Sequence, residues 1–464
     1  MSLHQALRTK HPRFIYRSAS WQVVEDTLQL TWQFELTPDI VFKPQMAIPL
    51  PTGFKQNETN GVIIDELVFQ IGLVEMLSYW KAAASPLIEI KAGSLTLDQI
   101  SWWKKLLLKG MGEYFYTNQI DFSGDDFVTV NATNSKETTL IPREKSNSSK
   151  DSYLIPLGGG KDSIVSLELM RQYQKEKQDS IQLTTMAINP TPATRQIAQT
   201  ANLPLLEVRR KLDPQLIELN SQGYLNGHTP FSALVAFTSL LTGYLHSSTN
   251  IVLSNEHSSN EGNTTYLGQE INHQYSKTFE FEQDFTQYVT KYLSNNLPKY
   301  YSLLRPLYEL KIGQLFARLA PEYFSIFRSC NRGQKQGIWC NQCSKCLFAF
   351  IILFPFLGEE QTVKIFGQNL FEDASLYDLA LELIGQTKIK PLECVGTKQE
   401  SLVAFFLSSN WYQDNSQPLP VVLEKLQPLL DNQPNLPAQA ETILTGWNEN
   451  HLVPPQLLEF IKTK

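Results

Sequence analysis

A glycine-rich turn between an apolar segment and a helical segment is where the sequence first indicates chemistry. Residues 153–157 are mostly apolar, as in a buried strand, and apolar residues return with helical spacing from residue 164. The turn between them consists of Gly158, Gly159, Gly160, Lys161, Asp162 and Ser163. Glycines allow the backbone to approach an anion, and a helix start presents free N–H groups to it. We therefore predict a phosphate site in which the lysine neutralises charge, the serine adds a hydroxyl and the aspartate binds Mg²⁺.

This turn is not a Walker A motif, because Ile155 stands where that motif requires its first glycine. It is not G-x-G-x-x-G either, because Ser163 occupies the last position. It resembles the PP-loop of ATP pyrophosphatases, S-G-G-x-D-S, with Gly158 in place of the leading serine. The resemblance implies cleavage of ATP between its α- and β-phosphates and transfer of AMP to an acceptor. The competing interpretation is an ordinary glycine turn between a strand and a helix.

Four of the five cysteines form a second pattern, C-x9-C-x2-C-x2-C. They are Cys330, Cys340, Cys343 and Cys346. This spacing predicts a tetrahedral Zn²⁺ site, which would be structural because four thiolates leave no open position. A [4Fe–4S] cluster, or buried or redox-active thiols, are the alternatives. Cys394 stands apart, and we interpret it as a core residue.

Two polar segments supply candidate side chains for proton transfer or for binding a substrate carboxylate. The first, residues 254–263, contains Glu256 and His257 and directly follows a predicted strand. The second, residues 268–282, contains His273, Tyr275 and Lys277 within five residues. All these residue types can transfer protons or bind anions. A plain surface loop and a structural histidine are the competing interpretations.

The elements that must position these groups alternate between strands and helices. Strands are predicted at 153–157, 181–188, 204–208 and 250–253, and helices after the glycine turn, at 191–201 and at 227–247. Such alternation predicts an α/β fold with a parallel sheet, whose ligands bind beyond the carboxyl ends of the strands. Asn189, which follows the second strand, is therefore expected to face the adenine of a nucleotide.

The chain as a whole divides into three predicted regions and a linker. Residues 1–132 are predicted as an α+β domain, with two antiparallel strands around residues 25–26 and helices at 61–81 and 97–115. Residues 133–152 form a polar linker, 153–357 the α/β domain with the four cysteines, and 358–464 a helical region. No chemical motif is visible in the last region.

Composition narrows the class of protein. The chain has 464 residues, of which 42% are hydrophobic and 19% charged, as in a globular protein. A net charge of −6 without a long basic run disfavours nucleic acid as a main partner. The longest apolar run, residues 346–357, is shorter than the roughly 20 residues of a membrane span and predicts a buried helix. Few cysteines and no apolar leader favour a cytoplasmic protein with no membrane partner.

Five segments together resemble the UDP-N-acetylmuramoyl-L-alanyl-L-glutamate epimerases of the MurL type. They are VEMLSYWKAAASP at 74–86, the tryptophans at 102–103, GGGKDSIVSLE at 158–168, NHQYSK at 272–277 and WCNQCSKCLFAF at 339–350. The resemblance implies a PP-loop fold similar to adenine nucleotide α-hydrolases. It also implies an isomerase of peptidoglycan precursor synthesis, which uses ATP and Mg²⁺ to convert the terminal L-Glu of UDP-MurNAc-L-Ala-L-Glu to D-Glu. AMP and pyrophosphate would be released.

Three other functions fit parts of the same pattern. A 7-cyano-7-deazaguanine synthase shares the loop and the cysteine spacing, and would activate a different carboxylate. A tRNA-modifying enzyme would need a basic face, which the net charge does not favour. A zinc-stabilised nucleotide-binding module would bind ATP without releasing pyrophosphate. The oligomeric state is not predicted by any of these patterns.

Overall fold

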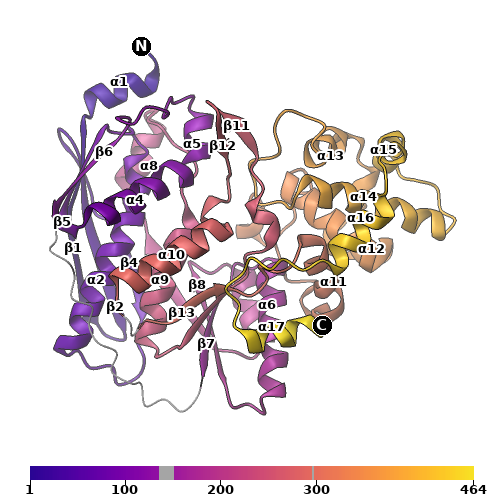
Figure 1. The fold of residues 1–464 in the computed structure, drawn as a ribbon, viewed down its shortest axis with the longest axis horizontal. Coiled ribbons are helices and arrows are strands. Elements are labelled where there is room, and N and C mark those ends of the chain that lie inside the picture. The colour runs from indigo at the N-terminus through magenta and orange to yellow at the C-terminus, as the bar shows by residue number, and fades with distance from the viewer. Residues whose placement is uncertain (135–150, 295–296) are drawn as a thin grey trace.

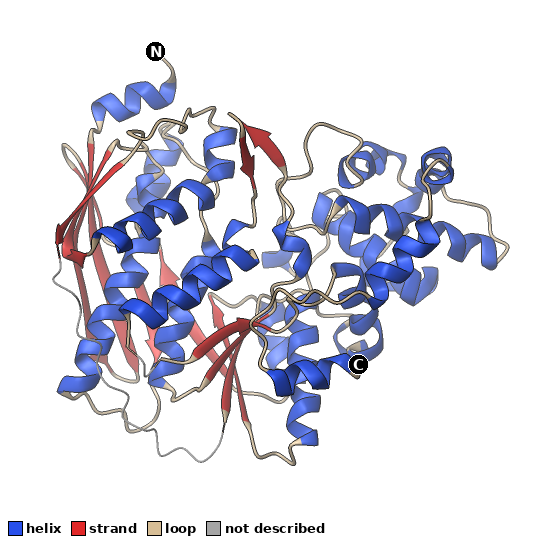
Figure 2. Cartoon of the chain, in the orientation of Figure 1, coloured by secondary structure: helices blue, strands red, loops and turns tan. Residues whose placement is uncertain are grey.

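A computed structural model of the chain describes residues 1–134, 151–294 and 297–464. Most of the predicted linker, residues 135–150, lies outside the described residues. An 11-stranded sheet runs through the first two thirds of the chain, and the C-terminal region is helical (Figures 1 and 2). The predicted α/β class and the helical C-terminal region are therefore confirmed.

The strands of this sheet come from both predicted N-terminal regions. In chain order they are β1 (Arg13–Val24), β2 (Thr27–Leu36), β3 (Ile40–Phe42), β4 (Gln45–Pro49), β5 (Leu87–Leu95), β6 (Thr129–Asn134), β7 (Ser152–Pro156), β8 (Gln182–Ile188), β9 (Leu205–Lys211), β10 (Asn250–Leu253) and β13 (Lys299–Ser302). A separate hairpin is made by β11 (Thr264–Tyr266) and β12 (Gln269–Ile271).

Helices fill the intervals between the strands. Those that precede residue 320 are α1 (Leu3–Lys10), α2 (Glu58–Glu75), α3 (Leu77–Trp80), α4 (Leu97–Gly110), α5 (Gly112–Thr117), α6 (Lys161–Glu176), α7 (Pro192–Thr200), α8 (Pro214–Ser221), α9 (Phe231–Leu245), α10 (Phe279–Tyr292) and α11 (Glu309–Leu319). The C-terminal helices are α12 (Ser344–Phe366), α13 (Tyr377–Leu383), α14 (Lys398–Asp414), α15 (Val421–Asp431), α16 (Leu436–Thr445) and α17 (Pro455–Lys462).

Five parallel strands in the order β13-β10-β7-β8-β9 form the half of the sheet that carries the predicted phosphate site. Helices cover both faces, so alternate strand residues enter different cores. Tyr153 and Ile155 of β7 pack in one core with α6 and α11, whereas Leu154 packs in the other with α2 and α9. The nearly continuous apolar sequence of these strands follows from this two-sided burial.

The N-terminal strands extend the same sheet. β4 pairs antiparallel with β9, placing Met46 opposite Arg210, and β2 pairs with both β1 and β4. β2 alternates buried and half-buried residues along its whole length, because one of its faces packs on α2. The predicted antiparallel pair around residues 25–26 is confirmed, and Glu25 has a positive φ of 52° in its turn.

Two predicted helices have different limits in the structure. The helix expected at 97–115 is divided into α4 and α5 at Met111, whose backbone leaves helical geometry. The helix expected from residue 227 begins only at Phe231, because Pro230 precedes it and proline fits a helix start rather than its interior. The elements α10, β13 and α11 were not predicted.

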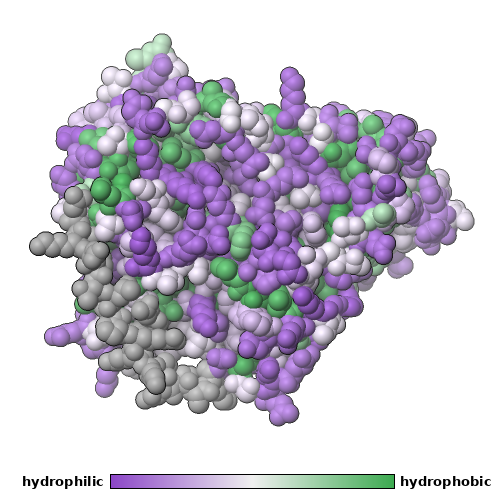
Figure 3. Space-filling model, viewed as in Figure 1, coloured by the Kyte–Doolittle hydropathy of each residue, from purple (hydrophilic) through white to green (hydrophobic). Residues whose placement is uncertain are grey.

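The apolar run at 346–357 lies in α12, and the prediction of a buried helix is confirmed. Among the described helices, α12 alone is long and apolar enough to cross a membrane by length and composition. Most of its apolar window is buried within the protein, as in a core helix, and Pro355 and Gly358 interrupt it. The face seen in Figure 3 is mainly polar, with apolar residues in small groups.

Candidate functional site

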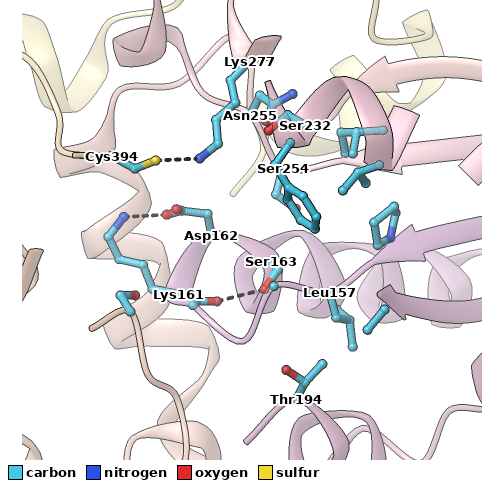
Figure 4. Close-up of a pocket in the computed structure, with 18 of the residues that line it drawn as sticks. Leu157, Lys161, Asp162, Ser163, Thr194, Ser232, Ser254, Asn255, Lys277 and Cys394 are labelled. Carbon is cyan, nitrogen blue, oxygen red and sulfur yellow. Dashed lines mark hydrogen bonds and ion pairs between the residues drawn. The ribbon is translucent and has the colours of Figure 1, made fainter. Parts of the chain in front are cut away.

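A cavity of about 380 Å³ opens at the carboxyl ends of the parallel strands (Figure 4). Residues that follow β7, β8 and β10 line it, together with the first turn of α6. β7 and β10 are neighbours in the sheet, but the chain proceeds from β7 towards β8 on the other side. This is the topological switch point at which open α/β sheets bind ligands.

Residues 158–163, here called the glycine loop, form the floor of the cavity at the start of α6. Gly160 is the helix N-cap, and none of the described side chains caps it, so the first N–H groups remain available to an anion. Every member of the loop except Gly159 lines the cavity. Gly159 has a φ of +84°, which favours glycine, and its carbonyl accepts a 2.9 Å bond from the Arg328 amide.

Three carboxylates from different elements converge above the glycine loop. Asp162, Glu256 and Glu309, here called the acid cluster, bring oxygen atoms within 4.8 Å of one another. Burial is the main cause that raises the pKa values of Glu256 and Glu309. Hard oxygen donors at this spacing suit Mg²⁺ that also carries phosphate oxygens.

Lys161 does not extend freely into the cavity as a phosphate ligand. It is buried, its Nζ lies 2.5 Å from Asp162 Oδ1, and it also forms an ion pair with Glu309. Its charge therefore offsets part of the negative charge of the acid cluster.

Arg305 positions two of the cavity residues through their backbones. It is fully buried and forms an ion pair with Glu282. Its guanidinium also donates to the carbonyl oxygens of Glu256 at 2.6 Å and Lys277 at 2.5 Å. A buried arginine with all these partners fixes the position of the segment after β10 relative to the segment after β12.

Lys277 enters the cavity and meets Cys394, which comes from the loop between α13 and α14. The Lys277 Nζ donates to the Cys394 Sγ over 3.4 Å (Figure 4). Burial alone would raise the pKa of the Cys394 thiol, but the basic groups Lys277, His273 and Lys345 lower it to about 5. The interpretation of Cys394 as a core residue is wrong, because its half-buried side chain lines the cavity.

His273 lies behind Cys394 rather than on the cavity lining. It is hydrogen-bonded to Glu113, and it interacts electrostatically with Cys394. Burial lowers the pKa of His273, but these two partners outweigh it and raise the pKa to about 9. The ring of His228 packs beside it in a tilted arrangement, with 4.3 Å between ring centroids, and burial together with the charge of His273 lowers the pKa of His228 to about 3.

The other site residues predicted from the sequence are paired with the backbone or lie outside the cavity lining. Asn189 lines the cavity, but its side-chain amide pairs with the backbone of Arg210 at 2.8 Å in both directions. His257 packs on the ring of Tyr308, and Tyr275 packs near Phe281, both outside the cavity lining.

The four spaced cysteines, here called the cysteine cluster, bring their sulfur atoms within 4.8 Å of one another. The Cys340–Cys346 and Cys343–Cys346 sulfur separations are 3.7 and 3.5 Å. Four thiolates at about 2.3 Å from one tetrahedral ion lie about 3.8 Å apart, so the geometry fits Zn²⁺. The segment that begins at Cys330 also supports the glycine loop, because Gln334 donates to the Gly158 carbonyl over 2.9 Å.

Comparison with protein families matches both halves of the chain. The family description "MurL N-terminal domain" matches residues 5–303, and "MurL C-terminal domain" matches residues 326–440. The chain belongs to the MurL family. The N-terminal family domain thus covers the whole sheet, and the C-terminal one begins just before the cysteine cluster.

Three curated relatives in the MurL family carry one name, UDP-N-acetyl-alpha-D-muramoyl-L-alanyl-L-glutamate epimerase. The protein from Xanthomonas oryzae pv. oryzae is 33% identical over 93% of each chain. Those from Micromonospora sp. and Salinispora tropica are each 32% identical, over 89% and 80% of this chain and 90% and 79% of theirs. Comparison with solved structures gave no significant match.

Sequence reasoning missed three residues that this MurL-family site depends on. Glu309 and Arg305 follow β13, a four-residue strand that was not recognised, so their approach to the carboxyl edge of the sheet was not expected. Cys394 lies in a region without any visible motif. Only an unpaired fifth cysteine could have drawn attention to it.

Replacing Lys277 by Met should raise the pKa of Cys394 towards the ordinary thiol value. With a pKa of about 5, the wild-type thiol is ionised above that pH and becomes protonated below it. At about pH 6.5, alkylation of Cys394 by iodoacetamide should therefore slow at least about tenfold in Lys277→Met. Peptide mass spectrometry gives the rate, and Lys291→Met, which changes an exposed lysine, is the control. Equal rates in all three proteins would contradict the proposed ion pair.

Proposed function

We propose that this protein converts the terminal L-Glu of UDP-MurNAc-L-Ala-L-Glu to D-Glu, using ATP to adenylate the glutamyl α-carboxylate. The names of relatives that share nearly its full length support the substrate and the epimerisation. The observation that carries the ATP-dependent step is the cavity itself, in which an anion-binding helix start, an acid cluster and an ionisable thiol share one space.

Activation of the carboxylate is needed because the α-proton of glutamate is otherwise hard to remove. The α-proton of a peptide-linked glutamate is only weakly acidic while the neighbouring carboxylate carries a negative charge. In the proposed reaction a carboxylate oxygen attacks the α-phosphorus of ATP and pyrophosphate leaves. In the acyl-adenylate the former carboxylate no longer carries a negative charge, so its carbonyl can accept electron density when the α-proton is removed. Hydrolysis releases AMP, and the consumption of ATP drives a nearly symmetric isomerisation.

Each group of residues has a proposed role in these reaction steps. The first amides of α6, Gly158 and Ser163 would bind the β- and γ-phosphates, since they line the cavity at a helix start. The acid cluster would hold Mg²⁺, which supplies positive charge to the phosphates and to the leaving pyrophosphate. Residues 188–191, beyond the end of β8, offer the adenine a wall that includes Asn189.

The cysteine cluster is proposed to hold a structural Zn²⁺. Four sulfurs that converge on one point suit a single ion, whereas an iron–sulfur cluster attaches each thiolate to a separate iron and spreads them apart. Through Arg328 and Gln334, which bond to the carbonyls of Gly159 and Gly158, the metal would stabilise the glycine loop.

Asp162→Asn should lower substrate-dependent pyrophosphate release by about 10²–10³-fold while the protein remains folded. The amide keeps the shape of the side chain but removes the charge that would bind Mg²⁺. The assay contains ATP, Mg²⁺ and UDP-MurNAc-L-Ala-L-Glu, and measures pyrophosphate and the chirality of the terminal glutamate. Asp179→Asn, on the exposed turn after α6, is the control and should retain full activity. Full activity of Asp162→Asn would exclude the metal-binding role.

Cys330→Ser should abolish zinc binding and weaken the glycine loop at the same time. Wild-type protein should contain about one zinc ion per chain by elemental analysis, and the variant much less. Because metal affinity contributes directly to folding, the free energy of unfolding should fall by several kcal/mol, and ATP should bind less tightly. Cys394→Ser removes a thiol outside the cluster and should keep its zinc. A Cys330→Ser protein with unchanged metal content would contradict the assignment.

A further inference from the structure

Cys394 is held at the cavity by contacts that involve its neighbours in the loop. Glu393 accepts bonds from the Ser344 hydroxyl at 2.8 Å and the Lys345 amide at 3.1 Å, at the start of α12. On the other side, the Asn263 amide donates to the Pro391 carbonyl over 2.6 Å. Among the described residues, Cys394 is the one member of the cavity lining that comes after Ala349. The loop thus delivers a single reactive side chain from the C-terminal region.

Three basic side chains stabilise the charge of the sulfur. Lys277 donates to it from within the cavity, and His273 and Lys345 also lower the pKa of the thiol. His273 is in turn paired with Glu113. These neighbours stabilise a thiolate on the cavity lining, because they are cationic when the sulfur is anionic.

The other candidate bases around the cavity have competing partners or the wrong protonation state. Lys277 has a pKa raised above its ordinary value, in which the charges of Cys394 and Glu256 outweigh burial, so it stays protonated. His273 has a pKa of about 9 and is also protonated near neutral pH. Glu256 belongs to the acid cluster. The thiolate of Cys394 is the lining group that can accept a proton without giving up such a role.

We propose that Cys394 removes the α-proton of the activated glutamyl residue, with Lys277, His273 and Glu113 as positioning residues. This role rests on the proposed epimerisation. The Cα–H bond breaks and an S–H bond forms, while the electron pair moves into the carbonyl of the acyl-adenylate to give an enolate. Lys277 lies where it can stabilise that negative charge. A water molecule then donates a proton to the opposite face, which inverts the α-carbon. The hydroxide that remains takes the proton from the Cys394 thiol and restores the thiolate.

The test uses full-length Cys394→Ser with ATP, Mg²⁺ and UDP-MurNAc-L-Ala-L-Glu in D₂O. Serine has nearly the size of cysteine and can keep its hydrogen bonds, but its hydroxyl is a far weaker base. Formation of D-Glu and deuterium incorporation at the α-carbon should fall by about 10²–10⁴-fold. Pyrophosphate release should stay within a few-fold of wild type, because adenylation does not need the thiol. The terminal glutamate of the UDP-MurNAc-dipeptide should remain L.

Three results would overturn the role of Cys394. One is deuterium incorporation in Cys394→Ser at the wild-type rate. Another is joint loss of pyrophosphate release and exchange, which would make the cysteine part of substrate binding. The third is a glutamyl adduct on Cys394 of quenched wild-type enzyme, which would make it a nucleophile. Failure of the proposed function itself is distinct, because wild-type protein would then form no D-Glu.

Glu113→Gln tests the positioning residues separately. Without this carboxylate His273 loses a partner that raises its pKa, and the thiol of Cys394 should then ionise at higher pH. The pH at which deuterium exchange reaches half its maximum should rise, while exchange at high pH should approach the wild-type rate. A uniform decrease at all pH values, without a shift of the profile, would indicate a structural role and contradict the proposal.

Discussion

The removal of several charges from water is the constraint around which this site is arranged. Three carboxylates and three lysines line one small cavity, and buried charges cost several kcal/mol each unless they are paired. Lys161 offsets Asp162 and Glu309, and Lys277 faces the thiol of Cys394. Among the described residues, Lys161 is the lysine that pairs directly with carboxylates of the acid cluster. The proposed Mg²⁺ would offset the negative charge that remains there.

Segments that are far apart in the sequence bring these charged groups together at the cavity. The parallel strands bring the ends of β7 and β10 together, so Asp162 and Glu256 meet although 94 positions separate them in the sequence. Arg305, itself neutralised by Glu282, holds the backbones of Glu256 and Lys277. The C-terminal family domain adds the cysteine cluster next to the glycine loop and Cys394 opposite Lys277. Both family domains of the MurL fold therefore build one site.

The parts of the site that could be predicted from the sequence are those encoded locally. A strand, three glycines and a helix start are consecutive, and the cysteine spacing identifies its own cluster without knowledge of the fold. The partners of these groups could not be predicted, because Lys161 and Glu309 are 148 positions apart and Lys277 and Cys394 are 117 apart. Tertiary packing alone decides such contacts. The same limit explains why β13 and α11 were not predicted. The start of α9 is different, because Pro230 is a local signal that the sequence already contains.

The central claim is that a substrate carboxylate is joined to the α-phosphorus of ATP in this cavity. It is tested most directly with UDP-MurNAc-L-Ala-L-Glu that carries ¹⁸O in the glutamyl α-carboxylate. Hydrolysis of the acyl-adenylate at its carbonyl leaves the bridging oxygen on phosphorus, so the AMP should contain one ¹⁸O atom for each turnover. D-Glu formed with unlabelled AMP, or without any AMP, would contradict the account.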